Sequence, residues 1–281
     1  MTTATFPTTA PHVAPSRARR LRVWLAAVLM LTLLVPASAA IADVTRTRGS
    51  LTNSAPIGRD SGADATLRQV RVGLHDGFDR VVFEYSGGLP AYHVRYTPIV
   101  RLDGSGMPFV VRGTVALHVA MQANSVDMDD PSFPKTFSPR RVTPDFPTLR
   151  EVRWGSEFEG VTTFAVGLTG RSGFRVIELS NPSRLVIDVA HGAVVRRLRS
   201  GYRGLDVRDW QVQLNTVQFG YWATSVRPPQ PRLETDGVFG PATTTATRTL
   251  QRAEGVTVTG VVDAATRAAL RGALRRVTSG V

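Results

Sequence analysis

The chain has 281 residues, of which 42% are hydrophobic and 20% charged, which is enough for one large domain or two ordinary ones. It contains no cysteine, and this excludes a disulfide framework, a thiolate metal site and a cysteine nucleophile. The net charge of +12 is unevenly spread: residues 193–281 hold 13 basic and 6 acidic side chains, against 17 and 16 in residues 43–192. A basic C-terminal part predicts an anionic partner.

The N-terminal segment has the layout of a secretory signal. Four arginines precede an apolar run over residues 23–35, and small residues follow it up to Ala42. This order of charge, apolar stretch and small residues is typical of a signal peptide, so we expect residues 1–42 to be removed. The apolar run is shorter than the roughly 20 residues of a membrane span, although residues 23–42 would just reach across. An uncleaved membrane anchor is therefore the alternative. Export argues against a nucleic-acid partner.

The next part of the chain has the pattern of β-strands. Residues 43–66 are polar and without periodicity, and we expect a flexible linker there. Residues 67–191 show short apolar–polar alternations bounded by turn residues, which predicts an antiparallel sandwich or barrel. His118 falls in the polar phase of one such run, and residues 122–148, rich in proline and aspartate, read as a long surface loop. The clearest alternations are Val70, Val72 and Leu74; Val81, Phe83 and Tyr85; Tyr92, Val94 and Tyr96; and Val115, Leu117, Val119 and Met121.

The periodicity becomes helical after Leu205, beyond an expected linker over residues 192–203. Asp206 is placed to cap the helix, and Asp209 follows three residues later, as in a capping box. Spacings of three and four residues predict one apolar helical face. This face consists of Val207, Trp210, Leu214 and Val217.

A short unit then occurs twice, at an offset of 23 residues: Gly237–Thr243 matches Gly260–Thr266. Each copy has a turn glycine, two apolar residues, a helix start and a threonine in the first turn. Pro241 suits the first helical position, where no amide donor is lost. Asp263 can cap the second helix through a side-chain oxygen. The repeat therefore predicts two short helices that start from equivalent loops.

Motifs in this part of the chain follow one another in a set order. They are Gly204-Leu205-Asp206-Val207, Trp210-Gln211-Val212-Gln213-Leu214, Asp236 through Thr243, Leu250-Gln251, Gly255-Val256 and Gly260 through Thr266. With this order and spacing, residues 204–277 resemble the three-helix peptidoglycan-binding module. That family attaches wall hydrolases and other envelope proteins to peptidoglycan and is not itself catalytic. Two departures are the long segment 218–235 and Thr259, where the second repeat often has aspartate.

A ligand made of sugar and peptide needs an open groove with aromatic faces and hydrogen-bond partners. The candidate peptidoglycan-binding residues are Tyr221, Trp222, Asp236 and Arg248. The structural alternative is that the motif residues serve only caps, turns and the core. Phe239 and Val262 are expected in the core, because apolar residues at such positions are usually buried.

The strand-rich part carries motifs of its own. They are the run from His75 to Tyr85, the run from Tyr92 to Tyr96 and the run from Ser183 to Asp188. With them, residues 67–191 resemble the AMIN-like domain of exported bacterial proteins. AMIN domains are β-sandwiches that localise envelope amidases, so the resemblance implies a role in binding or localisation.

Residues for catalysis or for metal binding do not form any recognisable motif. His75, Asp76 and Asp79 are close in sequence, but turn chemistry explains the aspartates, and Asp79 can pair with Arg80. The acidic residues near 127–130 lack a complete EF-hand pattern, and the glutamates at 157 and 159 do not by themselves make a glycosidase. We predict no catalytic residue, no metal site and no cofactor.

The expected protein is α+β with two domains, an antiparallel β-sandwich followed by a small three-helix bundle. We expect it to be secreted and associated with the cell wall, to bind peptidoglycan and to place the sandwich at the envelope, without catalysis. A cell-wall hydrolase or another envelope protein is a further expected partner. The first alternative is a cell-wall hydrolase, or an accessory regulator of one, with an unrecognised site in the β domain. The second is an interaction module whose helices are only structural.

Overall fold

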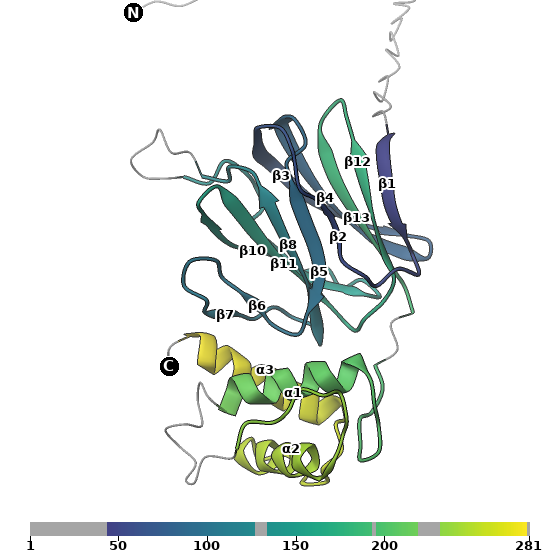
Figure 1. Ribbon diagram of the computed structural model, residues 1–281, viewed down its shortest axis with the longest axis vertical. Coiled ribbons are helices and arrows are strands. Elements are labelled where there is room, and N and C mark those ends of the chain that lie inside the picture. Colours follow the sequence, from purple (N-terminus) through teal and green to yellow (C-terminus); the bar gives the residue numbers. More distant parts are fainter. Residues whose placement is uncertain (1–43, 127–133, 193–194, 219–230, 280–281) are drawn as a thin grey trace, which may run out of the picture. The chain divides into compact units, whose positions relative to one another are not determined.

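Two antiparallel sheets form the N-terminal domain of the computed structural model, which describes residues 44–126, 134–192, 195–218 and 231–279 (Figure 1). The first sheet has the strand order β1 (Val44–Ser50), β12 (Phe174–Leu179), β13 (Arg184–Ala190), β4 (Phe78–Gly87), β3 (Ala65–His75). The second has the order β2 (Ile57–Arg59), β5 (Tyr92–Thr97), β8 (Val115–Gln122), β11 (Val161–Leu168), β10 (Leu149–Phe158), β9 (Arg141–Val142). A small hairpin joins β6 (Val100–Arg101) to β7 (Pro108–Phe109).

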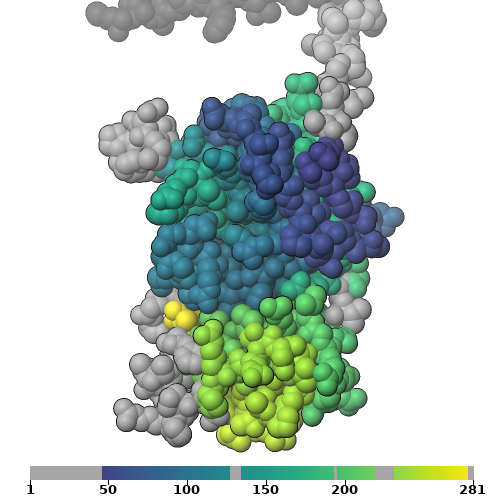
Figure 2. Space-filling view, viewed as in Figure 1, coloured from purple at the N-terminus to yellow at the C-terminus, as the bar shows by residue number. Residues whose placement is uncertain are grey.

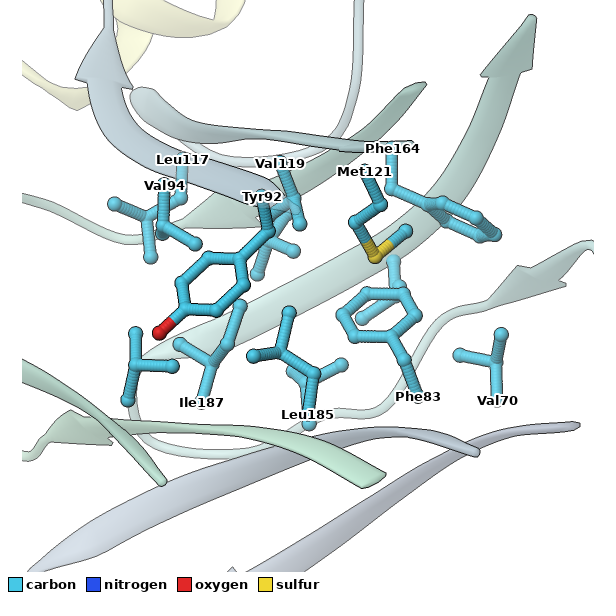
Figure 3. Close-up of a cluster of buried hydrophobic side chains, with 14 of the residues drawn as sticks. Val70, Phe83, Tyr92, Val94, Leu117, Val119, Met121, Phe164, Leu185 and Ile187 are labelled. Atoms are coloured by element: carbon cyan, nitrogen blue, oxygen red, sulfur yellow. The ribbon is translucent and has the colours of Figure 1, made fainter. Parts of the chain in front are cut away.

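Side chains from the inner faces of both sheets form one hydrophobic core (Figure 3). Phe83 from β4 and Phe164 from β11 are fully buried, and their rings meet edge to face with centroids 5.0 Å apart. The alternation of Val81, Phe83 and Tyr85 places all three in this core, because successive strand residues point to opposite faces. The predicted antiparallel sandwich is confirmed.

The expected flexible linker over residues 43–66 is wrong where the structure has strands, which is about half of its length. β1 pairs with β12, and β2 pairs with β5. Ile57 of β2 is buried in the core. The partner strand of β1 lies more than a hundred residues away in sequence, and no local periodicity shows such a pairing.

The expected surface loop over residues 122–148 also contributes to the domain. Its residues 127–133 lie outside the described part of the chain, but Phe137 belongs to the sandwich core and β9 pairs with β10. His118 is buried as well, although its strand pattern placed it on the polar side. The outer face of β8 is covered, since Ala116 packs in a small cluster with Val100 and with Phe109 from the β6–β7 hairpin.

Three helices form the C-terminal module: α1 (Leu205–Val217), α2 (Pro241–Ala253) and α3 (Ala264–Ser279). They share a second hydrophobic core, which contains Phe239 and Val262 as expected. The predicted apolar face of α1 is buried throughout. The exposed fractions are 0% for Val207, 1% for Trp210, 1% for Leu214 and 0% for Val217.

The expected linker over residues 192–203 is partly built into the helical module. Leu198 is fully buried, and its backbone N–H and C=O bond to Val262 at 3.2 and 2.8 Å. Arg203 forms a similar bridge to Val238. The chain therefore joins the module as an extended segment before α1 starts. The Leu198 side chain holds this segment in place because it packs in the helical core.

Residues 40–281 form one compact unit, in which α1 contacts the sandwich directly. Arg171 forms a two-pronged ion pair with Asp209, with N···O distances of 2.8 and 3.0 Å. The Gln213 side chain donates to the carbonyls of Pro98 and Thr114 at 2.9 and 3.0 Å. Asp209 is thus a contact to the sandwich, and the capping-box role expected for it is wrong.

Candidate functional site

The first repeated loop of the helical module is held by one buried side chain, Gln211 of α1. Its amide nitrogen donates to Asp236 Oδ1, to the Val238 carbonyl and to Thr243 Oγ1 at 2.8, 3.0 and 3.1 Å. Its amide oxygen accepts from the backbone N–H of Gly237 at 2.9 Å. Both the nitrogen and the oxygen of the amide are bonded to this loop, and these bonds fix the loop's shape.

The second loop is held in the same way by Gln251 of α2. Its nitrogen donates to Thr259 Oγ1, to the Val261 carbonyl and to Thr266 Oγ1 at 3.2, 3.0 and 3.0 Å. Its oxygen accepts from the N–H groups of Thr259 and Gly260 at 3.0 and 2.8 Å. The sequence repeat is therefore a structural repeat, in which each helix clamps the loop that starts the next one.

The turn glycines of the two loops have matching backbone geometry. Gly237 has φ +75° and Gly260 has φ +74°, a left-handed conformation that favours glycine. In addition, a Cβ atom at Gly237 would lie 3.0 Å from the carbonyl oxygen of Gly204. Both positions therefore need glycine for the fold, independently of any ligand.

The helix starts agree with the sequence in two cases and differ in one. Pro241 is the first residue of α2, and Asp263 caps α3 by accepting from the Thr266 N–H at 2.8 Å. The expected cap by Asp206 is wrong, because Gly204 occupies the cap position of α1 with φ 132°. Asp206 lies in the first turn and forms an ion pair with Arg196 at 2.7 Å.

Asp236 is exposed on the first loop, and its Oδ1 atom also accepts from the Val238 N–H at 2.9 Å. This bond, followed by the bond from Gln211, holds the pKa of the Asp236 carboxyl below its usual 3.8. The carboxylate is therefore ionised at any pH above about 4. A charged group on a rigid loop is suited to receive hydrogen bonds from a polar ligand.

Arg248 is exposed on α2 and lies close to the second loop, since its Nε atom would be 3.0 Å from a Cβ atom at Gly260. No hydrogen bond or ion pair joins Arg248 to Asp236 in the described part of the chain. Residues of α2 and its flanking loops, coloured yellow-green, form much of the module surface in Figure 2. The other two candidates, Tyr221 and Trp222, lie outside the described residues, as does the expected signal peptide.

The sequence missed the role of Gln211 and Gln251. A signal for them existed, because each glutamine directly follows an apolar core residue, Trp210 or Leu250, on the helix before its loop. The offset of 23 residues aligns the loops, but it does not align the two glutamines, and so the repeat did not single them out.

The polar residues considered for metal binding in the sandwich have other partners. Asp79 is fully buried and accepts from the N–H groups of Thr148 and Leu149, both at 2.8 Å, and it also bonds to His191. His75 stacks on Phe78 instead. Among the described residues, no group of three or more His, Asp and Glu side chains is arranged to hold a metal ion.

Comparison with protein families agrees with this division of the chain. Residues 65–191 match the model of the AMIN-like domain, so the sandwich is a domain of that type. Residues 203–270, which contain both clamped loops, match the model described as "Putative peptidoglycan binding domain". The protein thus joins an AMIN-like domain to a peptidoglycan-binding-type domain, as the motifs predicted, and this pair indicates association with the cell wall. A comparison with curated proteins found none that matches.

Both matched domains are of binding types, and neither model describes a catalytic domain. In the described ranges, no helix is long and apolar enough to cross a membrane.

Proposed function

We propose that this protein is exported and binds peptidoglycan through its helical module, without catalysis, so that the sandwich is positioned at the cell envelope. The observation that carries the proposal is the coincidence of two findings. The family match to a peptidoglycan-binding domain covers residues 203–270, and the same residues contain two loops fixed by buried glutamines. Rigid loops favour binding, because less conformational entropy is lost when the ligand is bound.

The proposed ligand contacts are Asp236 and Arg248, together with Tyr221 and Trp222. Asp236 supplies a charged acceptor, and Arg248 supplies donors suited to the carboxylates of wall peptides. The two aromatic side chains would supply the flat apolar faces on which sugar rings pack. The experiments below address the two of these residues that the structure describes, Asp236 and Arg248.

The direct test is sedimentation of the chain from residue 43 onward with insoluble peptidoglycan that has been stripped of attached polymers. We expect the protein to appear in the pellet in a saturable, concentration-dependent way. Protein that stays in the supernatant with such peptidoglycan at any concentration would show that the module is not a wall anchor and that its helices are only structural.

Single substitutions then test the binding face. Asp236→Asn keeps the acceptor for Gln211 but removes the charge, and Arg248→Gln removes the guanidinium, so each should weaken peptidoglycan binding about tenfold. Arg252→Gln is the matched control, because Arg252 is exposed on the same helix as Arg248. Equal binding by all three variants would remove Asp236 and Arg248 from the site.

Catalysis is tested on the same material. We expect no release of soluble muropeptides when the protein is incubated with purified sacculi. Released muropeptides would favour the alternative, a hydrolase with its site in the β domain. If the protein positions a hydrolase instead, release should rise only when a wall hydrolase is added together with it.

A further inference from the structure

An arginine-lined cleft of about 530 Å³ lies between α3 and the edge of the sandwich. One wall is formed by α3 and the other by the segment around Arg112 and by residues near the end of β11. No acidic residue lines it. Its arginines are Arg112, Arg150, Arg267, Arg271 and Arg275.

The α3 wall has a regular construction. Arg267, Arg271 and Arg275 are four residues apart, and this spacing places them along one side of the helix. Ala264, Ala268 and Gly272 line the same cleft with the same spacing, three residues earlier. A row of small side chains therefore runs beside a row of guanidiniums, and leaves room for a ligand against the helix.

Two of these arginines, Arg267 and Arg271, are half-buried. Burial, first among the causes, lowers the pKa of each below its usual value, while the charge of Asp206 acts in the opposite direction on Arg267. No carboxylate oxygen of the described residues forms an ion pair with either one. Other arginines of the module are paired, as Arg196 is with Asp206 and Arg276 with Glu254.

A half-buried positive charge that is not fully neutralised is costly, and a bound anion would lower that cost. Among the described residues, the Arg267 guanidinium donates to the backbone carbonyl of Arg196 at 2.9 Å and lies over the Trp210 ring, 5.9 Å from its centroid. Arg112, which belongs to the sandwich, lines the same cleft. Positive side chains on both walls favour a ligand whose negative charges can be contacted from two sides.

We propose that this cleft binds a linear polymer of phosphodiester-linked units, as a second wall ligand besides peptidoglycan. A phosphate group offers several oxygens to several guanidinium forks, whereas one fork already occupies both oxygens of a carboxylate. A single chain can pass between two protein walls, but the flat surface of a membrane cannot reach the recessed Arg267 and Arg271. The proposal does not depend on the peptidoglycan contacts proposed above at Asp236, on the first loop, and at Arg248, on α2.

Linear polyphosphate serves as the probe, with the chain from residue 43 onward as the protein. Arg271→Gln and Arg112→Gln each remove one guanidinium from a different wall, and each should weaken polyphosphate binding about tenfold. Arg252→Gln removes the same charge from an exposed position on α2 and should leave binding unchanged. Binding should also weaken as salt rises, because the contacts are ionic.

Thermal unfolding of each variant shows whether it is folded. Arg112 is exposed and lies outside α3, so Arg112→Gln tests the cleft without changing the helix. An equal loss for Arg252→Gln would mean that net charge, and not the cleft, attracts the polyanion, which overturns the proposal. Tight binding to vesicles of anionic lipid with none to polyphosphate would also overturn it. Sedimentation with polymer-free peptidoglycan should be unchanged in the Arg112 and Arg271 variants, so failure of this proposal and failure of wall binding are distinguishable.

Discussion

The two glutamines that hold the loops of the helical module differ from one buried histidine of the sandwich in their hydrogen bonding. In the module, Gln211 and Gln251 use both atoms of their amides on loop partners. In the sandwich, neither ring nitrogen of His118 has a hydrogen-bond partner among the described residues. An unpaired buried polar group costs about 1–3 kcal/mol, so the two paired glutamines support the fold of the module while His118 weakens that of the sandwich. Burial of a polar residue therefore does not by itself show that the residue stabilises the fold.

The largest expected effect comes from breaking a clamp. Gln251→Ala should lower the free energy of unfolding by about 3 kcal/mol, because several backbone groups of the second loop lose their partner. Gln211→Ala should cost a similar amount in the first loop. Denaturant unfolding measures both values. Arg252→Ala, next to Gln251 but exposed, is the control and should change stability by less than about 0.5 kcal/mol. A cost for Gln251→Ala no larger than that of the control would show that the clamp is not structural.

Replacing the unpaired histidine should have the opposite sign. His118→Leu keeps a side chain of similar size and removes two unpaired nitrogen atoms, so we expect a gain of about 1 kcal/mol in the free energy of unfolding. Thermal or denaturant unfolding at neutral pH measures it. A loss of 1 kcal/mol or more would indicate that the histidine has a partner in the folded protein.

The same histidine makes the sandwich sensitive to acid. Burial, followed by the charge of Arg95, holds the pKa of His118 below its usual 6.5, although Asp103 acts in the other direction. As the pH falls below 6.5, the unfolded chain takes up a proton before the folded protein does, so stability decreases. Above that pH the histidine adds no pH dependence. Comparison of unfolding curves between pH 7 and pH 5 should show a smaller decrease for His118→Leu than for the unchanged protein.

The helix caps give a smaller effect. Asp263→Ala should cost about 1 kcal/mol through loss of the bond from Thr266. This bond lowers the pKa of the Asp263 carboxyl below its usual 3.8, so the stabilisation is present above that pH and decreases as the pH falls through the lowered value. Pro241→Ala, at the equivalent helix start, should not change this acid dependence. The measurement is denaturant unfolding between pH 5 and pH 2.

The smallest effect is expected from making the two loops alike. Thr259→Asp places in the second loop the residue that Asp236 provides in the first, where Gln211 accommodates it. We expect a change in stability below about 0.5 kcal/mol, because Gln251 can donate to a carboxylate as it does to the threonine hydroxyl. A larger loss in denaturant unfolding would show that the clamps of the two loops are not equivalent.

Features encoded locally could be predicted from the sequence. The face of α1, the two loop–helix units and the burial of Phe239 and Val262 follow from spacing and turn chemistry over a few residues. Features that depend on distant partners could not. β1 pairs with β12 far along the chain, and Asp209 pairs with Arg171 of the sandwich, so each was assigned to a local role that the tertiary contacts replace.

In the candidate site, too, the local features could be predicted and the contacts between distant residues could not. Asp236 and Arg248 were chosen as hydrogen-bond partners for a ligand of sugar and peptide, and both are exposed in the structure, but their role in binding stays a prediction. The structure also assigns Asp236 a structural bond to Gln211 that the spacing of the loops does not show. The arginine cleft combines residues of α3 with Arg112, which are far apart in sequence, so only the folded chain shows it.

The short stretch of chain between the two domains limits how far one can move from the other. Among the described residues, His191 makes the last backbone bond of the sandwich, and the helical module first holds the chain at Arg196, whose backbone carbonyl accepts from Arg267. At full extension, the chain from residue 191 to residue 196 spans roughly 17 Å. Even if the ion pair of Arg171 and Asp209 opened, the linking chain would let the sandwich move away from the helical module by no more than about this distance. If the helical module binds the wall as proposed, any partner of the sandwich would then act within a narrow zone of the wall.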